Sequence, residues 1–160
     1  MSSSRNLLLA IAAVSLALIG AALYLQHAMG MLPCPLCVIQ RYFYLGIAFF
    51  SLIGAWMGKS ANKIKAGAGL ALLCALGGLG YVGKHLYVLA HPGFSCGIDP
   101  MQTTLNKIPT ATLLPGLFRA DGLCEAAQET VFGLNVPQWS AVWFTILTLA
   151  LLWTLVRRAR

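Results

Sequence analysis

Four long runs of apolar residues dominate the chain, and most polar residues fall in the segments between them. The runs cover residues 7–25, 42–57, 66–82 and 139–156. A helix that crosses a bilayer needs about 20 predominantly apolar residues, so each run predicts one membrane-spanning helix. No internal repeat, low-complexity tract or long linker divides the sequence. We therefore expect an all-α membrane protein, a four-helix transmembrane bundle that forms a single domain over residues 1–160.

The first apolar run could instead be a secretory signal, because Arg5 precedes it and small residues lie near its end. The run is longer than the core of a typical signal peptide, which spans about 7–15 residues. The residues at its end, Leu25-Gln26-His27-Ala28, are a poor match to a small-residue cleavage site. We expect this segment to stay as the first helix.

Composition agrees with a membrane location. Apolar residues make up 59% of the 160 residues and charged residues only 9%, which leaves too little polar surface for a soluble protein of this size. The net charge of +7 mainly reflects orientation in the membrane, with weak attraction to anionic lipids as a side effect. We expect no nucleic-acid partner.

The basic residues predict the orientation, because Lys and Arg are retained on the cytoplasmic side of a membrane. Arg5 lies in the amino-terminal tail, three lysines follow the second run at 59–65, and three arginines end the chain at 157–160. These segments alternate with the other two loops. Both termini are therefore expected in the cytoplasm, and the loops at about 26–41 and 83–138 are expected in the periplasm or outside the cell.

Four of the five cysteines fall in the two outer loops. Cys34 and Cys37 lie in the first, Cys96 and Cys124 lie in the second, and Cys74 lies within the third run. Disulfides persist only on the oxidising side of a membrane, so the four outer cysteines are the ones placed to form them. Cys74 is best explained as a small apolar filler.

The C-x-x-C motif of Cys34 and Cys37 favours redox chemistry. A disulfide across two residues removes little chain entropy, so it is a poor structural staple and a good site of thiol exchange. Cys96 and Cys124, with 27 residues between them, could form a structural staple instead. Four cysteines allow three pairings, and the sequence alone leaves these open.

Metal and haem binding are disfavoured. Cys96 and Cys124 lack the tight spacing of a zinc knuckle, and thiols in an oxidising compartment tend to pair with each other. Val38 follows Cys37 where a c-type haem attachment would need His. We expect no metal site.

Arg41 marks the second candidate feature. Pro35 favours the first turn of a helix, which would put Cys37 at a helix start, where the unpaired N–H groups favour a thiolate. Arg41 is one turn further along the same face. It could be an anchor for lipid phosphates. Outer membrane boundaries are depleted of Arg, however, so we favour a role beside a lipid-soluble electron acceptor, whose developing negative charge the guanidinium would stabilise.

In this order the motifs resemble the bacterial disulfide bond formation protein B (DsbB) family, over nearly the whole chain. The matching positions are C-x-x-C-x-x-x-R at Cys34, Cys37 and Arg41, then His85, then Pro115, Phe118 and Gly122 before Cys124, then Gly133-Leu134 and Pro137-Gln138-Trp139 before the last run. The resemblance also implies a short amphipathic surface helix in the segment 101–118. Gln40 departs from the pattern, since an acid is common there.

The resemblance implies a thiol oxidase of the bacterial inner membrane that reoxidises a periplasmic DsbA-like partner and passes electrons to the membrane quinone pool, ubiquinone or menaquinone. Its redox-active disulfides would be Cys34–Cys37 and Cys96–Cys124. The partner's thiolate would attack Cys96, and Cys124 would attack Cys34. Cys37 would then pass electrons to the quinone, with Arg41 and His85 beside it.

Two alternatives remain at this stage. A quinone-epoxide reductase resembling the vitamin K family also has four helices and a C-x-x-C motif, but there the motif belongs near a late helix. A membrane scaffold whose cysteines only staple loops would need neither Cys37 nor Arg41 for any redox step.

Overall fold

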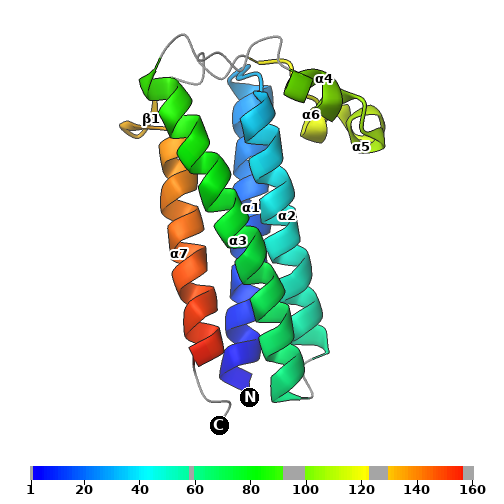
Figure 1. Ribbon diagram of the computed structural model, residues 1–160, viewed down its shortest axis with the longest axis vertical. Helices are drawn as coiled ribbons and strands as arrows, with labels where there is room; N and C mark the ends of the chain where they lie inside the picture. Colours follow the sequence, from blue (N-terminus) through cyan, green and yellow to red (C-terminus); the bar gives the residue numbers. More distant parts are fainter. Residues whose placement is uncertain (1, 58–59, 92–99, 123–129, 157–160) are drawn as a thin grey trace.

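Four long helices lie side by side in the computed structural model, which describes residues 2–57, 60–91, 100–122 and 130–156 (Figure 1). They are α1 (Ser2–Ala28), α2 (Pro35–Trp56), α3 (Ala61–Ala90) and α7 (Val136–Val156). Each is long and apolar enough to cross a membrane. The predicted class, a four-helix membrane bundle, is confirmed.

The helices extend beyond the apolar runs expected from the sequence. α2 begins at Pro35, well ahead of residue 42, and α3 ends at Ala90, beyond residue 82. Backbone hydrogen bonds define a helix, whereas hydropathy marks only the part suited to the hydrocarbon core, so polar turns continue past it. The motif Cys34–Cys37 consequently belongs to a helix start and not to a free-standing loop.

Glycines set the contact between α2 and α3. A methyl group added to Gly67 would lie 2.5 Å from the Cα of Gly54 and 2.9 Å from the carbonyl oxygen of Phe50. The two backbones therefore touch directly. In lipid, where there is no hydrophobic drive between helices, such close packing of small residues is a main source of helix association.

Aromatic side chains fill the space beside two other glycines of α3. A methyl group on Gly77 would meet the ring of Phe43, and one on Gly78 would meet the ring of Phe144. The sulfur of Cys74 lies 2.8 Å from a methyl group built on Gly46. Cys74 thus makes a packing contact between α2 and α3.

The buried core runs through the centre of the bundle. Leu8, Ile47, Ala75, Phe144 and Leu151 are almost completely buried within it. Large apolar side chains also cover the outside of the bundle, among them Leu73 at 66% exposure and Leu149 at 62%. An apolar exterior of this extent is typical of a surface that faces lipid.

The segment expected to form one surface helix forms three short ones. These are α4 (Pro100–Asn106), α5 (Pro109–Leu113) and α6 (Pro115–Phe118), which lie beside the end of α2 at which that helix begins (Figure 1). Pro109 and Pro115 each occupy the start of a helix, where the missing N–H is not needed, and each would interrupt a longer one. Phe118 stacks on the ring of Tyr42 at 4.4 Å between centroids, which fixes the segment to α2.

A small hairpin, which the sequence did not lead us to expect, precedes α7. Its strands are β1 (Thr130–Val131) and β2 (Leu134–Asn135). Phe132 and Gly133 between them have φ values of 53° and 83°, as a type I′ turn requires. The indole N–H of Trp139 donates to the Val131 carbonyl at 2.8 Å, which holds the hairpin against α7.

Candidate functional site

The two cysteines of the C-x-x-C motif stand at the start of α2. Cys34 is the residue before the first turn, and its sulfur accepts a hydrogen bond from the Cys37 N–H at 3.3 Å. Pro35 follows in the first helical position. The Sγ atoms of Cys34 and Cys37 are 2.9 Å apart, so they are a dithiol in hydrogen-bond contact. Both sulfurs lie where the helix start favours negative charge.

His85, on α3, contacts this dithiol from the side. Its Nε2 lies 3.7 Å from the Cys34 sulfur, and its Nδ1 lies 3.3 Å from the side-chain amide of Gln40. The imidazole is completely buried. A histidine that contacts a thiol through one nitrogen and a fixed amide through the other has the arrangement of a positioned acid or base.

The orientation of the Gln40 amide sets the tautomer of His85. When the NH₂ group donates to Nδ1, Nε2 carries the imidazole proton and donates toward the Cys34 sulfur. When the amide is turned the other way, Nδ1–H donates to the Gln40 oxygen and Nε2 can accept the proton of Cys34. Gln40, noted from the sequence only as a departure, is therefore a direct neighbour of the site.

Arg41 is fixed inside the protein. The guanidinium is 6% exposed and donates from Nη1 to the Leu117 carbonyl at 2.8 Å. Its positive charge lies one helical turn from Cys37 on the same face of α2. This position differs from that of a lipid-phosphate anchor, which would reach outward to the membrane surface.

A cavity of about 640 Å³ opens beside the dithiol, within the range typical of small-molecule sites. One wall is a single face of α2, formed by Cys37, Gln40, Arg41 and Tyr44, whose spacing repeats with the turn of a helix. The other walls are mostly apolar and come from α1, α7 and the hairpin, including Leu18, Ala22, Gln26, Phe132, Trp139 and Trp143. Most of the polar groups lie on the α2 wall, and most of the remaining surface is apolar. This distribution suits a ligand with an apolar body and a few polar atoms.

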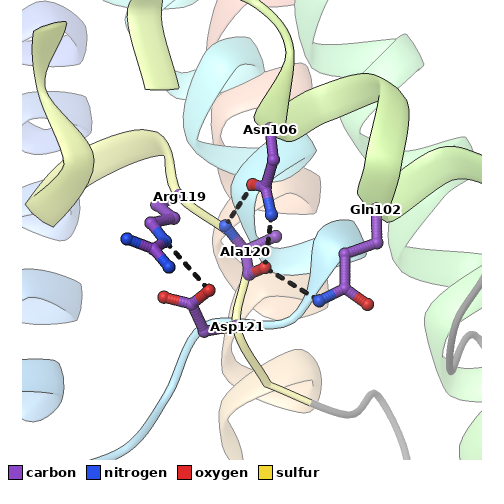
Figure 2. A network of polar contacts seen from close by, with 5 residues as sticks. All are labelled: Gln102, Asn106, Arg119, Ala120 and Asp121. Carbon is purple, nitrogen blue, oxygen red and sulfur yellow. Dashed lines mark hydrogen bonds and ion pairs between the residues drawn. The ribbon is translucent and has the colours of Figure 1, made fainter. Parts of the chain in front are cut away.

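The segment after α6 is bound to the loop between α1 and α2, just before Cys34. Asn106 holds both backbone groups of Ala120, accepting from its N–H at 2.9 Å and donating to its carbonyl at 3.0 Å, and Gln102 donates to the same carbonyl (Figure 2). The N–H groups of Asp121 and Gly122 each donate to the Pro33 carbonyl at 3.1 Å. Residues 120–122 are thereby held against the residue that precedes Cys34.

Only glycine fits at position 122. A methyl group there would lie 2.3 Å from the Leu32 carbonyl oxygen. The sequence puts Cys124 two residues further along. Cys124 and Cys96 themselves lie outside the described residues.

The structure brings together four of the residues predicted from the sequence, Cys34, Cys37, Arg41 and His85. His85 contacts Cys34 and is not among the residues that line the cavity. The sequence did not point to Tyr44 or to Trp143, and it marked Trp139 only as part of the family resemblance. Tyr44 lies at helical spacing from Cys37 and Arg41, so a search along that helix face would have found it.

This combination of a membrane bundle, a dithiol at a helix start and an adjoining fixed guanidinium defines a membrane thiol–disulfide oxidoreductase. A family profile described as "Disulfide bond formation protein DsbB" matches residues 4–154. A protein named Disulfide bond formation protein B from Herminiimonas arsenicoxydans is 51% identical over 158 residues, 99% of each chain. One of the same name from Ralstonia nicotianae is 45% identical over 159 residues, 99% of this chain and 98% of the relative. The chain therefore belongs to the DsbB family of disulfide bond formation proteins.

Proposed function

We propose that the chain is an inner-membrane thiol oxidase that reoxidises a periplasmic DsbA-like partner and passes the electrons to a quinone, ubiquinone or menaquinone. The observation that carries this proposal is that Cys37 and Arg41 line the same cavity at the outer end of the bundle. A thiol and a fixed positive charge beside an apolar cavity are what electron transfer to a lipid-soluble acceptor requires.

The residues around the cavity fit a quinone. Its ring and isoprenoid tail suit the apolar walls from α1 and α7, and its carbonyl oxygens suit the Arg41 guanidinium. Gln26 also lines the cavity, and its Oε1 is buried without a hydrogen-bond partner among the described residues. An acceptor without a partner suits a ligand that gains an O–H group, because a buried polar group left without a hydrogen bond is costly.

The first part of the relay is disulfide exchange. The partner's thiolate attacks Cys96, and Cys124 leaves; the partner's second thiol then releases Cys96 and leaves the partner oxidised. Cys124 attacks Cys34 in the Cys34–Cys37 disulfide and releases the Cys37 thiolate. Cys96 then attacks Cys124 and reforms the second disulfide, so that Cys34 and Cys37 are left as the dithiol. The contact of Asp121 and Gly122 with Pro33 supports this path, because it holds the chain near Cys34 two residues before Cys124.

The second part oxidises the dithiol. Cys34 and Cys37 form their disulfide and lose two electrons and two protons, which the bound quinone accepts to become quinol. Arg41 stabilises the negative charge that develops on the acceptor oxygen. His85, held by Gln40, takes the proton of Cys34 as the Cys34 sulfur forms its bond to the Cys37 sulfur and the two electrons pass to the quinone.

A reconstituted assay tests the proposal. The purified chain is mixed with a soluble quinone analogue and a reduced DsbA-like protein, and partner oxidation and quinone reduction are followed together. We expect both to proceed at equal rates, and to fall to background in Cys37→Ser. Cys74→Ser, which removes the cysteine at the α2–α3 contact, is the matched control and should keep activity. Absence of partner oxidation by the unmodified chain, or full activity in Cys37→Ser, contradicts the proposal.

A further inference from the structure

The reduced dithiol and His85 form a compact set of soft ligands. The two sulfurs and one imidazole nitrogen all lie within 4.8 Å of one another. In tetrahedral zinc sites, with Zn–S of about 2.3 Å and Zn–N of about 2.0–2.1 Å, neighbouring ligand atoms stand about 3.5–3.8 Å apart. The Cys34 sulfur and His85 Nε2, at 3.7 Å, already have this separation. The sulfurs, at 2.9 Å, need only to open by less than about 1 Å.

The surroundings of His85 also suit a metal ligand. A histidine that binds a metal through one nitrogen almost always donates its other N–H to a fixed acceptor. The Gln40 amide stands at 3.3 Å from Nδ1 and can present its oxygen there. Gln40 would thus serve as the partner that orients the imidazole toward the metal.

Charge and access are compatible with a divalent cation. Binding releases the two thiol protons, so the charge at this buried site is the same before and after one M²⁺ enters. Cys37 and Gln40 line the cavity, which gives the ion a path of entry and leaves a fourth position for water. Arg41 repels a cation but also favours the thiolates, and its guanidinium is fixed to the Leu117 carbonyl.

In contrast to the expectation from the sequence, which considered the cysteines without His85, we propose that the reduced chain binds one thiophilic divalent cation of the zinc class through Cys34, Cys37 and His85. The site exists only while the cysteines are reduced, because a disulfide offers no thiolate ligands. A bound cation holds both sulfurs and so blocks formation of the Cys34–Cys37 disulfide. This inhibition, unlike the binding itself, rests on the proposed function.

A direct metal titration tests the binding. The full chain with Cys74, Cys96 and Cys124 changed to Ser is reduced without oxygen and titrated with Co²⁺, and then with Zn²⁺ against a chromophoric chelator. We expect one ion per chain, with the thiolate charge-transfer and tetrahedral ligand-field bands of Co²⁺. Oxidising the remaining pair should abolish the bands. Absence of binding above that of the same chain with Cys34→Ser and Cys37→Ser overturns the proposal.

Variants of the imidazole and its partner separate this site from nonspecific thiol binding. His85→Ala should weaken zinc binding by at least about tenfold, and Gln40→Leu, which leaves the ligands in place, by about 10–100-fold. His91→Ala is the matched control, because His91 is exposed just after α3 and its ring contacts the carbonyl and the ring of Tyr87. Unchanged affinity in both His85→Ala and Gln40→Leu contradicts the assignment.

The binding and the proposed function fail separately. If the chain binds zinc but oxidises no partner, the metal site is supported and the proposed oxidase function is wrong. If the chain oxidises the partner but its reduced Cys34–Cys37 pair binds no cation, only the proposed metal site is wrong. If both hold, Zn²⁺ should stop quinone reduction by the reduced chain, and a chelator should restore it.

Discussion

Among single residues, Arg41 makes the contacts that best support the proposed electron transfer from the dithiol to a quinone. Its hydrogen bond to the Leu117 carbonyl fixes the guanidinium, and the same side chain lines the cavity beside Cys37. A positive charge that is already in place stabilises developing negative charge without the cost of reorganising at the moment of reaction. The geometry of the fork matters as well as its charge, because Lys cannot donate in two fixed directions.

Replacing Arg41 should therefore affect quinone reduction in a graded way. We expect Arg41→Met to lower the rate of quinone reduction by about 10²–10³-fold, the usual effect of removing one donor to a developing oxyanion, and Arg41→Lys to lower it less. Steady-state assays over a range of quinone concentrations measure this. Lys84→Met is the control, because it removes an exposed positive charge from α3 one residue before His85. An Arg41→Met chain as fast as the unmodified one would refute this role.

At the scale of elements, two contacts determine how the site is assembled. The backbone contact between α2 and α3 brings His85 to Cys34, and the contact of residues 120–122 with the first loop brings the second loop to the dithiol. Both contacts depend on glycine at a point where a methyl group would meet backbone atoms. Backbone atoms cannot move aside as a side chain can, so these positions are sensitive to small substitutions.

The helix contact can be tested at Gly67. We expect Gly67→Ala to lower the free energy of unfolding by about 1–3 kcal/mol, because its methyl group would lie 2.5 Å from the Gly54 Cα. Gly69→Ala, two residues away with nothing within 4 Å, should be neutral or raise stability by up to about 1 kcal/mol through helix propensity. Unfolding in mixed micelles measures both. Equal stabilities of the two variants would show that the helices do not touch at Gly67.

The loop contact can be tested at Gly122. Gly122→Ala would push against the Leu32 carbonyl, at a typical cost of about 1–3 kcal/mol, and should slow partner oxidation by roughly tenfold to a hundredfold. Quinone reduction fed by a small dithiol that reduces Cys34–Cys37 directly should change little. Gly116→Ala, whose nearest neighbour at 3.7 Å is an ordinary contact, is the control. Equal loss in both assays would contradict a specific role in coupling the loops.

At the scale of the whole molecule, the sequence predicts the bundle well and the site in part. The four helices follow from hydropathy, because lipid forces the backbone of a spanning segment to satisfy its own hydrogen bonds. The contact of His85 with Cys34, 51 residues away, depends on where α2 and α3 cross, and no local pattern encodes that. The cavity likewise forms only when several segments far apart in the sequence come together. The pairing of Cys96 with Cys124 stays a prediction.

The orientation of the molecule also stays a prediction. α1 begins and α7 ends at the same end of the bundle, opposite the end where α2 begins (Figure 1). Arg5 lies in the first turns of α1, and Lys63 and Lys65 lie in the first turns of α3, so we expect that the end where these helices begin faces the cytoplasm. A reporter fused after residue 160 should fluoresce if it is a green fluorescent protein and stay inactive if it is alkaline phosphatase. Active phosphatase at that position would reverse the proposed topology.

The proposed transfer of electrons from the Cys34–Cys37 dithiol to a quinone is tested most directly by one single-turnover measurement. A chain with Cys96→Ser and Cys124→Ser is reduced, freed of reductant and mixed with one equivalent of quinone without oxygen. We predict one quinol formed per chain, with loss of two protein thiols and formation of the Cys34–Cys37 disulfide. Quinone that stays oxidised, or thiols lost without quinol, would contradict the account.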